Sequence, residues 1–288
     1  MTGFGADWLA MREPFDADAR SAGLVGELAA HWSHAEVKEI VDLATGTGAN
    51  VRYLAPRIDG RQRWTVLDHD PRLLEAVAPR LAGWAERRGF RFRRRGPDMT
   101  VTGDGFEAVV QPRELDLARD LDRVVQEGVH LVTAAALLDL VSERWLARLA
   151  RSCRSAGAAV LFALTYDGET TWSPEDSDDA RVRDAVNRHQ GLDKGFGPAL
   201  GPRAAGCAAT LYGTAGYRVA QARSDWRIGP EAGAMQRALL EGWRAAATEI
   251  EPNRSSAFAG WAARRAAAIA QGVSALRVGH VDIAGRPD

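Results

Sequence analysis

The chain has 288 residues, 46% of them hydrophobic, and its 37 basic and 38 acidic residues give a formal net charge of -1. This length suffices for one α/β domain with a sizeable core, and the balanced charge argues against bulk electrostatic binding to nucleic acid or to an anionic membrane. The sequence has no secretory-signal pattern and no apolar run of roughly eighteen residues, so we expect a cytoplasmic protein that does not enter a membrane.

Helical patterns occupy residues 5–32, on both sides of Pro14. Within them Arg12 and Arg20 flank two aspartates, at 16 and 18. Such charges are typical of a solvated helix face, but an arginine can also bind a ligand carboxylate with its fork of N–H donors. Arg20 is the candidate for that second role.

The segment 37–50, VKEIVDLATGTGAN, predicts a buried strand, a glycine-rich turn and the start of a helix. Gly46 and Gly48 permit positive φ and let a ligand lie directly on the backbone. Asn50 falls near the start of the helix, where backbone N–H groups would face the ligand. This arrangement is typical of a nucleotide site.

A second strand is predicted at 63–67, and it completes a right-handed βαβ unit with the first. Asp68 ends that strand, where an acidic residue can accept bonds from both ribose hydroxyls of a nucleoside. Asp70 and Pro71 instead indicate the N-cap and first position of the next helix. The two aspartates therefore have different predicted roles.

The segments VDLATGTG and VLDHDP resemble the first two motifs of class I S-adenosylmethionine-dependent methyltransferases. Ala44 stands where that family usually has glycine, which is the mildest available departure. The resemblance implies S-adenosylmethionine as the cofactor. It places the following residues in the cofactor site: Asp42, Ala44, Thr45, Gly46, Gly48, Asn50, Asp68, His69, Thr133 and, from the N-terminal helices, Arg20.

Dinucleotide-dependent dehydrogenases also have a glycine-rich loop, with an acidic residue about twenty positions further on. Their third glycine would fall on Val51, and they have no ready use for Asp42. An NAD(P)-dependent oxidoreductase is therefore the alternative interpretation, together with a non-catalytic protein that binds S-adenosylmethionine.

The segment 86–95 is basic, with Phe90 and Phe92 interleaved. It is typical of a helix end that enters an edge strand, and RNA contact is the other interpretation. The following segment turns at 103–105, which predicts a hairpin.

The third core strand is expected to end near residue 115. By resemblance, the acidic residue that follows this strand lies beside the adenine of the cofactor. Asp116 and Leu117 are the candidates, with Asp120 or Asp122 as alternatives.

Residues 129–135 predict the fourth core strand, at whose end cofactor and substrate should meet. Asp139 follows and either polarises a substrate hydroxyl or amine, or caps a helix. The segment lacks the Asn/Asp-Pro-Pro-Tyr sequence of methyltransferases that act on base amino groups, and Cys153 lacks the preceding proline of base C5 methylation. We therefore expect a small-molecule acceptor and no nucleic-acid partner.

A fifth strand at 158–165 leads to Tyr166 at the same edge of the sheet. The residues up to 205 are rich in Asp, Gly and Pro and predict a lid or substrate loop. His189 within this segment is a candidate general base, because an ordinary histidine pKa lies near neutrality. The catalytic candidates are thus Asp139, Tyr166 and His189.

Two expectations concern metals and disulfides. Cys153 and Cys207 are too few for a disulfide framework and too far apart for a CxxC metal site. His31 and His34 are close in sequence, but no third ligand motif accompanies them. We expect no metal centre.

By the resemblance, the chain adopts a Rossmann-like class I methyltransferase fold: α/β, with a seven-stranded, mostly parallel sheet whose last strand is antiparallel, and helices on both faces. One domain is expected over 1–288, with a helical layer at 1–36, a cofactor core at 37–165, a lid at 166–205 and the rest of the sheet at 206–288. The expected activity is methyl transfer to an oxygen or nitrogen of a small molecule, by a monomer or homodimer.

Overall fold

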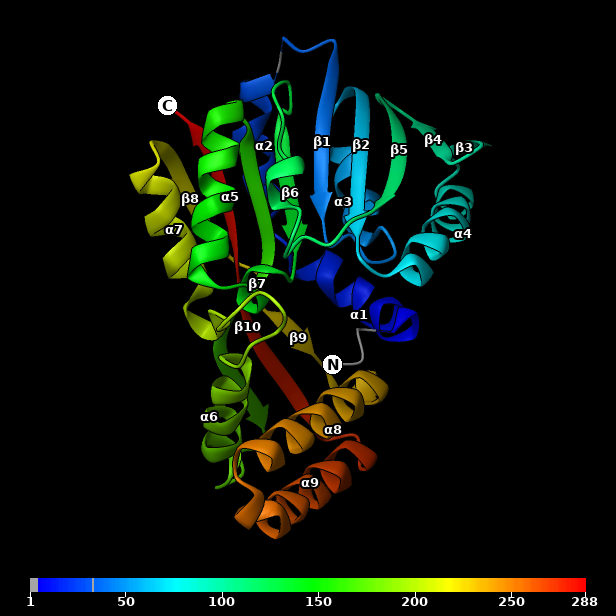
Figure 1. Ribbon diagram of the computed structural model, residues 1–288. Helices are drawn as coiled ribbons and strands as arrows, with labels where there is room; N and C mark the ends of the chain where they lie inside the picture. The colour runs from blue at the N-terminus through cyan, green and yellow to red at the C-terminus, as the bar shows by residue number, and fades with distance from the viewer. Residues whose placement is uncertain (1–4, 33) are drawn as a thin grey trace.

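One mixed sheet organises the molecule (Figure 1). The computed structural model describes residues 5–32 and 34–288, and within these ranges ten strands follow the order β3-β4-β5-β2-β1-β6-β7-β10-β8, with β9 paired to β10. The strands are β1 (Val37–Leu43), β2 (Gly60–Asp68), β3 (Arg91–Arg95), β4 (Asp98–Gly103), β5 (Phe106–Glu114), β6 (Leu131–Ala135), β7 (Ala159–Ser173), β8 (Tyr217–Arg223), β9 (Trp226–Ile228) and β10 (Ala275–Pro287).

This topology confirms the predicted fold class. Strands β5, β2, β1, β6 and β7 are parallel neighbours, and β10, the last strand in the chain, runs antiparallel to both β7 and β8. Three strands add to the expected seven. Strands β3 and β4 extend one edge beyond β5, through a hairpin that turns at Asp104 and Gly105 as predicted, and β9 pairs with the outer part of β10.

Helices cover both faces of the sheet, which explains why its central strands are apolar at consecutive positions. Ile40 and its neighbour Val41 point to opposite faces and belong to different core clusters. The cluster around Ile40 is covered by α2 (Ala22–Ala29), α3 (Ala49–Leu54) and α4 (Pro71–Arg87), and the cluster around Val41 by α5 (Glu143–Ala156) and α7 (Ala204–Thr214).

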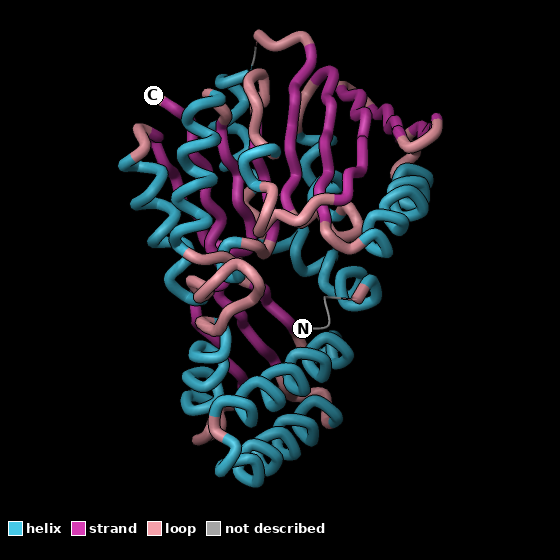
Figure 2. Tube along the Cα trace, in the orientation of Figure 1, coloured by secondary structure: helices cyan, strands magenta, loops and turns pink. Residues whose placement is uncertain are grey.

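A distal lobe extends the sheet beyond this core (Figures 1 and 2). It consists of the outer ends of β7 and β10, strand β9, and the helices α6 (Asp179–Gln190), α8 (Gly233–Ile250) and α9 (Ser255–Ala270). Trp172 on β7 and Trp261 on α9 lie at its centre, with ring centroids 6.4 Å apart. The lobe therefore has an apolar core of its own.

The first part of the expected lid at 166–205 is a strand in the structure. Residues 166–173 continue strand β7, because their backbone pairs with β10 from Tyr166 opposite His280 to Ser173 opposite Ala275. The segment then forms α6 and a loop that leads to α7. The expected start of the lid at residue 166 thus falls inside a strand of the single expected domain.

Strand β7 is kinked where it passes from the core to the distal lobe. Leu164 has φ of 56°, a left-handed conformation that costs a non-glycine residue about 1 to 2 kcal/mol. The buried carboxylate of Asp282 on β10 accepts hydrogen bonds from the backbone N–H groups of Leu164 at 2.8 Å and Ser21 at 2.9 Å. Asp282 therefore holds the kink and also the start of α2.

The N-terminal helix α1 (Ala6–Ala19) crosses below the carboxyl ends of β1 and β2 in Figure 1. Of the expected helical layer at 1–36, residues 1–4 and 33 lie outside the described residues.

No helix in the described ranges has the length and hydrophobicity needed to cross a membrane. The short 3-10 helices are η1 (Ala30–Trp32), η2 (Ala55–Arg57), η3 (Leu121–Arg123), η4 (Leu138–Leu140), η5 (Gly201–Arg203), η6 (Pro230–Ala232) and η7 (Pro252–Arg254).

Candidate functional site

The glycine-rich loop leaves the carboxyl end of β1 in a left-handed backbone conformation. The φ angles of Ala44, Gly46 and Gly48 are 50°, 56° and 80°, and Gly48 directly precedes α3. Backbone bonds close the turn, since Thr45 N–H donates to the carbonyl of Leu67 on β2 at 2.8 Å. The two glycines therefore adopt the positive φ that the sequence predicts for this turn.

A buried network supports this loop from below. Asp42 accepts hydrogen bonds from Thr45 Oγ1 at 2.5 Å and from Asn50 Nδ2 at 2.6 Å. Asn50 in turn accepts from Arg20 Nη1 at 2.7 Å and contacts Thr133 Oγ1 at 3.1 Å. Five residues predicted for the cofactor site are thus brought together, and their polar groups hold the shape of the loop.

The electrostatics of Asp42 follow from its burial. Its side chain is 0% exposed, and this burial raises the pKa of the carboxyl to about 6, while the bonds from Thr45 and Asn50 and the charge of Arg20 oppose the rise. Arg20 lies over the ring of Tyr53, with its guanidinium carbon 4.0 Å from the centroid. Arg20 is therefore anchored inside the network.

Asp68 connects the end of β2 to the glycine-rich loop. Its Oδ2 accepts from Gly46 N–H at 2.8 Å and its Oδ1 from Asp70 N–H at 3.0 Å. His69 is largely exposed beside it, with Nδ1 3.4 Å from Oδ1. A carboxylate has about four acceptor positions, so Asp68 retains capacity for further hydroxyl donors. Asp70 accepts from Arg72 N–H at 2.9 Å and caps α4, as predicted.

The predicted adenine residues follow β5 at the same edge. Leu115 N–H donates to the carbonyl of Asp68 at 2.9 Å, which brings this segment beside the end of β2. Asp116 is exposed and accepts from Ala118 N–H at 2.9 Å, whereas the side chain of Leu117 is buried in the core. The main chain and the Asp116 carboxylate are therefore the groups that face outward.

Helix α1 covers the glycine-rich loop, a feature that the sequence did not predict. A Cβ atom on Gly46 would lie 2.9 Å from Leu9 Cδ1. Glu13 accepts from Arg52 on α3 through both carboxylate oxygens, and Arg52 Nη1 also donates to the carbonyl of Thr47 in the loop at 2.7 Å. The helix and the loop are thus joined through Arg52.

Asp139 follows β6, and Tyr166 lies in the neighbouring strand β7, at the point where this strand leaves the core. Asp139 is in η4, 7% exposed, and its Oδ1 has no hydrogen-bond partner. Burial raises its pKa to about 6, partly offset by backbone N–H groups, including that of Tyr166. Tyr166 donates from its hydroxyl to Asn187 Oδ1 at 2.8 Å. The structure therefore brings these two catalytic candidates into one neighbourhood.

His189 has different surroundings. It lies in the last turn of α6, with Nε2 3.2 Å from Glu249 on α8 and Nδ1 3.5 Å from Lys194 Nζ. These contacts form a polar cluster on the surface of the distal lobe. The structure does not group His189 with Asp139 or with the glycine-rich loop.

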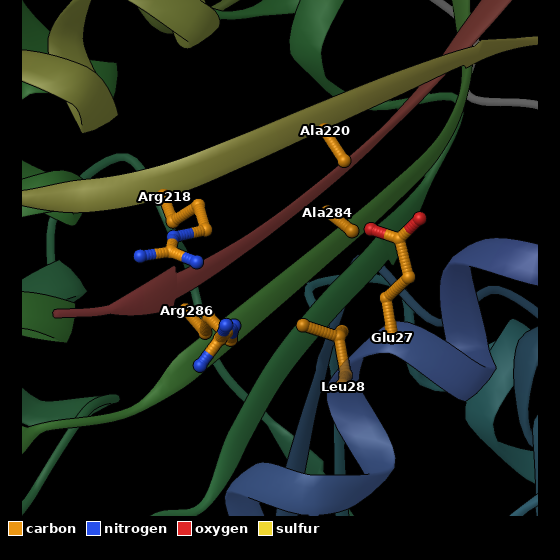
Figure 3. A pocket seen from close by; sticks show the side chains of 6 residues that line it. All are labelled: Glu27, Leu28, Arg218, Ala220, Ala284 and Arg286. Carbon is orange, nitrogen blue, oxygen red and sulfur yellow. The ribbon is translucent and has the colours of Figure 1, made fainter.

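Two cavities lie away from the glycine-rich loop and from Asp68. One, of about 240 Å³, is between α2 and the strands β8 and β10, where Glu27 faces Arg218 and Arg286 (Figure 3). The other, of about 460 Å³, lies over the face of β1, β2 and β5, beside Val41 and Leu67. Neither is lined by the glycine-rich loop or by Asp68. No set of three potential metal ligands occurs among the described side chains.

Comparison with known proteins gives matches in structure only. No protein-family model matches the chain, and no curated protein sequence matches it. The YcgJ protein of Bacillus subtilis aligns with a TM-score of 0.47 at 9% identity, over 93% of this chain and 100% of that chain. An S-adenosylmethionine-dependent methyltransferase from Thiobacillus denitrificans, in complex with S-adenosylhomocysteine, gives a TM-score of 0.45 at 12% identity, over 98% and 99%.

The cyclopropane synthase MmaA2 from Mycobacterium tuberculosis gives a TM-score of 0.42 at 10% identity, over 90% of this chain and 83% of that chain. With TM-scores below 0.5 and identities of 12% or less, these structures do not identify the function of this chain. The function has to be inferred from the residues of the chain itself.

Proposed function

We propose that the chain is a class I S-adenosylmethionine-dependent methyltransferase that acts on an oxygen or nitrogen of a small molecule. One relationship carries this proposal: the Asp68 carboxylate at the end of β2 accepts a hydrogen bond from Gly46 N–H in the left-handed loop after β1. In an open α/β sheet, such a loop with an acidic neighbour at the next strand end binds a nucleoside at the carboxyl edge.

The residues present fit the cofactor. Asp68 can accept from ribose hydroxyls, and the backbone beside Asp116 lies at the same edge for the adenine. Thr47 Oγ1, in the loop, is buried without a hydrogen-bond partner and supplies a further polar contact. Among the described residues, the end of the flexible Leu9 side chain is the group that a Cβ atom on Gly46 would meet within 4 Å.

Each part of the site has a role in this proposal. Asp42, Thr45, Asn50, Thr133 and Arg20 keep the loop in its binding conformation. When bound, S-adenosylmethionine would supply a methyl group on a sulfonium that is already a good leaving group. The chain then has to align the acceptor, exclude water and remove a proton. Asp139, which follows β6, is the acidic group that would accept this proton.

We further propose that the protein works in the cytoplasm, as a monomer or homodimer, without a nucleic-acid partner. The balanced charge of the chain supports the last part, because it offers no general attraction to a polyanion.

Calorimetric titration with S-adenosylmethionine, S-adenosylhomocysteine and NAD⁺ tests the cofactor. We expect both sulfur nucleosides to bind, and NAD⁺ to give no heat. Binding of NAD⁺ alone would favour the oxidoreductase alternative. The variant Leu9→Ala serves as a second test, because it removes the side chain that lies over Gly46. If neither the wild type nor this variant binds S-adenosylhomocysteine, the proposal is wrong.

A further inference from the structure

Two buried polar side chains at the junction between the core and the distal lobe have atoms without hydrogen-bond partners among the described residues. Asp139 is 7% exposed and His280 is 5% exposed, and Asp139 Oδ1 and His280 Nδ1 are both unpaired. They lie on either side of β7, since β6 precedes Asp139 and β10 carries His280. Tyr166 on β7 pairs directly with His280, and their ring centroids are 6.2 Å apart. The three side chains therefore belong to one cluster.

Aromatic groups surround this cluster. The ring of Trp226 on β9 lies 4.8 Å from that of His280. The Arg12 guanidinium of α1 lies 4.9 Å above Trp226. Trp8, one helical turn before Arg12, packs against the same apolar cluster, and its Nε1 is also buried and unpaired. Helix α1 thus closes the cluster with Trp8 and Arg12 and closes the glycine-rich loop with Leu9.

The charged and titratable groups of the cluster differ in whether an opposite charge neutralises them. Arg12 is already neutralised by Asp16, to which its Nε donates at 2.9 Å. Asp139 has no ion-pair partner within hydrogen-bond distance among the described residues, although the charge of Arg12 acts on it from further away. The pKa of His280 is lowered to about 3, chiefly by burial and also by the charge of Arg12, so this imidazole is neutral. A bound molecule would therefore meet one carboxylate, one neutral imidazole and a compensated arginine.

A purely structural role does not account for these groups. A buried polar atom without a partner costs about 1 to 3 kcal/mol, and three occur here together. Irregular backbone also precedes Asp139, Tyr166 and His280. Ala136 and Leu164 have φ of 54° and 56°, and a register shift separates Val278 from His280. Such irregularities re-aim side chains and gather at functional sites.

We propose that Asp139, Tyr166, His280, Trp8 and Trp226 form the site of the methyl acceptor, and that this acceptor is a planar aromatic molecule with an uncharged hydroxyl or amino group. This inference rests on the proposed function. The indole and phenol rings provide faces and edges for stacking on a planar ring. Asp139 and His280 provide the two polar contacts. The unpaired carboxylate excludes anionic acceptors, because a second negative charge would be repelled in a buried site.

The reaction balances with these groups. The acceptor oxygen forms a bond to the methyl carbon, while the bond between that carbon and sulfur breaks and its electron pair stays on sulfur. The O–H bond of the acceptor breaks and its proton passes to Asp139, which later releases it to water. An amine would react in the same way through its N–H group. His280 holds the hydroxyl or amine through a hydrogen bond.

Binding of small aromatic probes tests the inference. Catechol, 2-naphthol and 2-naphthoate are titrated into the protein saturated with S-adenosylhomocysteine, and binding is followed by tryptophan fluorescence. At least one of the two neutral probes should bind, and 2-naphthoate should bind at least tenfold more weakly than 2-naphthol. Asp139→Asn and His280→Gln should each weaken the neutral probe about tenfold. Asp139→Asn should also improve binding of 2-naphthoate, because it removes the repelling charge.

Matched controls are available on the same chain. His130→Gln alters a histidine whose Nδ1 accepts from Glu39 N–H, away from the cluster. Asp193→Asn alters a loop carboxylate that accepts from Gly195 N–H at 2.7 Å. Both should leave probe binding unchanged. Circular dichroism shows whether each variant folds. If either Asp139→Asn or His280→Gln fails to fold, probe binding by the other variant tests the proposal.

The outcomes separate the two proposals. If S-adenosylhomocysteine binds but neither neutral probe does, or if cluster and control variants bind the probe equally, the acceptor site is wrong and the proposed function stands. If S-adenosylhomocysteine does not bind to the wild type or to Leu9→Ala, the proposed function is wrong and the acceptor site falls with it.

Discussion

Arg52 on α3 donates to both carboxylate oxygens of Glu13 on α1, at 2.7 Å each. Only 3% of the Arg52 side chain is exposed, and the same guanidinium holds the carbonyl of Thr47 in the glycine-rich loop. This pair fastens α1 to the loop that it covers.

Replacing Glu13 by glutamine should loosen this attachment, because a buried guanidinium would lose its charged partner. The Glu13 side chain is 27% exposed. We therefore expect the free energy of unfolding to fall by about 1 to 3 kcal/mol, less than the loss of about 3 to 5 kcal/mol typical of a fully buried pair. Urea denaturation measures this loss, and hydrogen exchange should become faster in α1. The matched control is Glu241→Gln, in the exposed pair with Arg244, which should change little. Equal effects of the two variants would contradict a fastening role.

Asp68→Ala should weaken binding of S-adenosylmethionine. The variant loses the acceptor for the ribose and also the bond that holds Gly46 N–H. A loss of about 1 to 3 kcal/mol is expected for a charged acceptor, or roughly fivefold to 150-fold in affinity. Calorimetry provides the measurement. Asp70→Ala is the control, since it removes the cap of α4 and should lower thermal stability without changing the affinity. Unchanged affinity of Asp68→Ala would show that the nucleoside lies elsewhere.

Asp139→Asn should stabilise the protein at alkaline pH while abolishing methyl transfer. The folded-state pKa of Asp139 is raised from 3.8 to about 6, so its contribution to stability is full below about pH 4 and is lost as the pH rises through 6. The groups that face it are Arg12 of α1 and the backbone at Tyr166. Asparagine removes this titration. The variant should match the wild type near pH 4 and exceed its free energy of unfolding by about 1 to 3 kcal/mol at pH 8.

Denaturation curves between pH 4 and 8 check this prediction. Asp42 titrates in the same window, but it is present in both proteins and cancels in the difference. A difference curve that is flat with pH would mean that Asp139 is not buried as a charged group.

Asp282→Asn should destabilise the junction between the core and the distal lobe. The carboxylate accepts from both Leu164 and Ser21 N–H groups, and asparagine keeps only one acceptor oxygen. A buried N–H group left unpaired costs about 1 to 3 kcal/mol. Hydrogen exchange should rise at these two amides first. Asp193 also accepts from two backbone N–H groups, at 2.7 and 3.0 Å, but on an exposed loop, so Asp193→Asn provides the control. Similar losses for both variants would be the contrary result.

Local features of the fold could be predicted from the sequence. The apolar run of β1 has the observed bounds, Val37–Leu43, because a strand buried on both faces needs little beyond its own residues. The cap at Asp70 and the turn at Gly105 are likewise decided within a few residues. The contacts of Asp42 with Thr45 and Asn50 follow from the same short segment.

Long-range features could not be predicted in this way. The outer half of β7 has the sequence YDGETTWS, which lacks a strand pattern and becomes a strand only by pairing with β10, about 110 residues later. The proximity of His280 to Tyr166 and Trp226 could not be predicted either, because it depends on the same pairing. A left-handed leucine at 164 has no signal in the sequence, since Asp282 supplies the bond that holds it.

Helix α1 presents different faces to its two neighbours. Leu9 and Glu13 face the glycine-rich loop and α3, while Trp8 and Arg12 face the distal lobe, and each pair is four residues apart. Successive residues of an α-helix are about 100° apart around its axis. Inserting or deleting one residue between Leu9 and Arg12 would therefore rotate Arg12 and Glu13 by about 100° relative to Trp8 and Leu9, and both faces would be split while the helix stays intact. The role of α1 therefore depends on the spacing of these residues along the helix as well as on their identity.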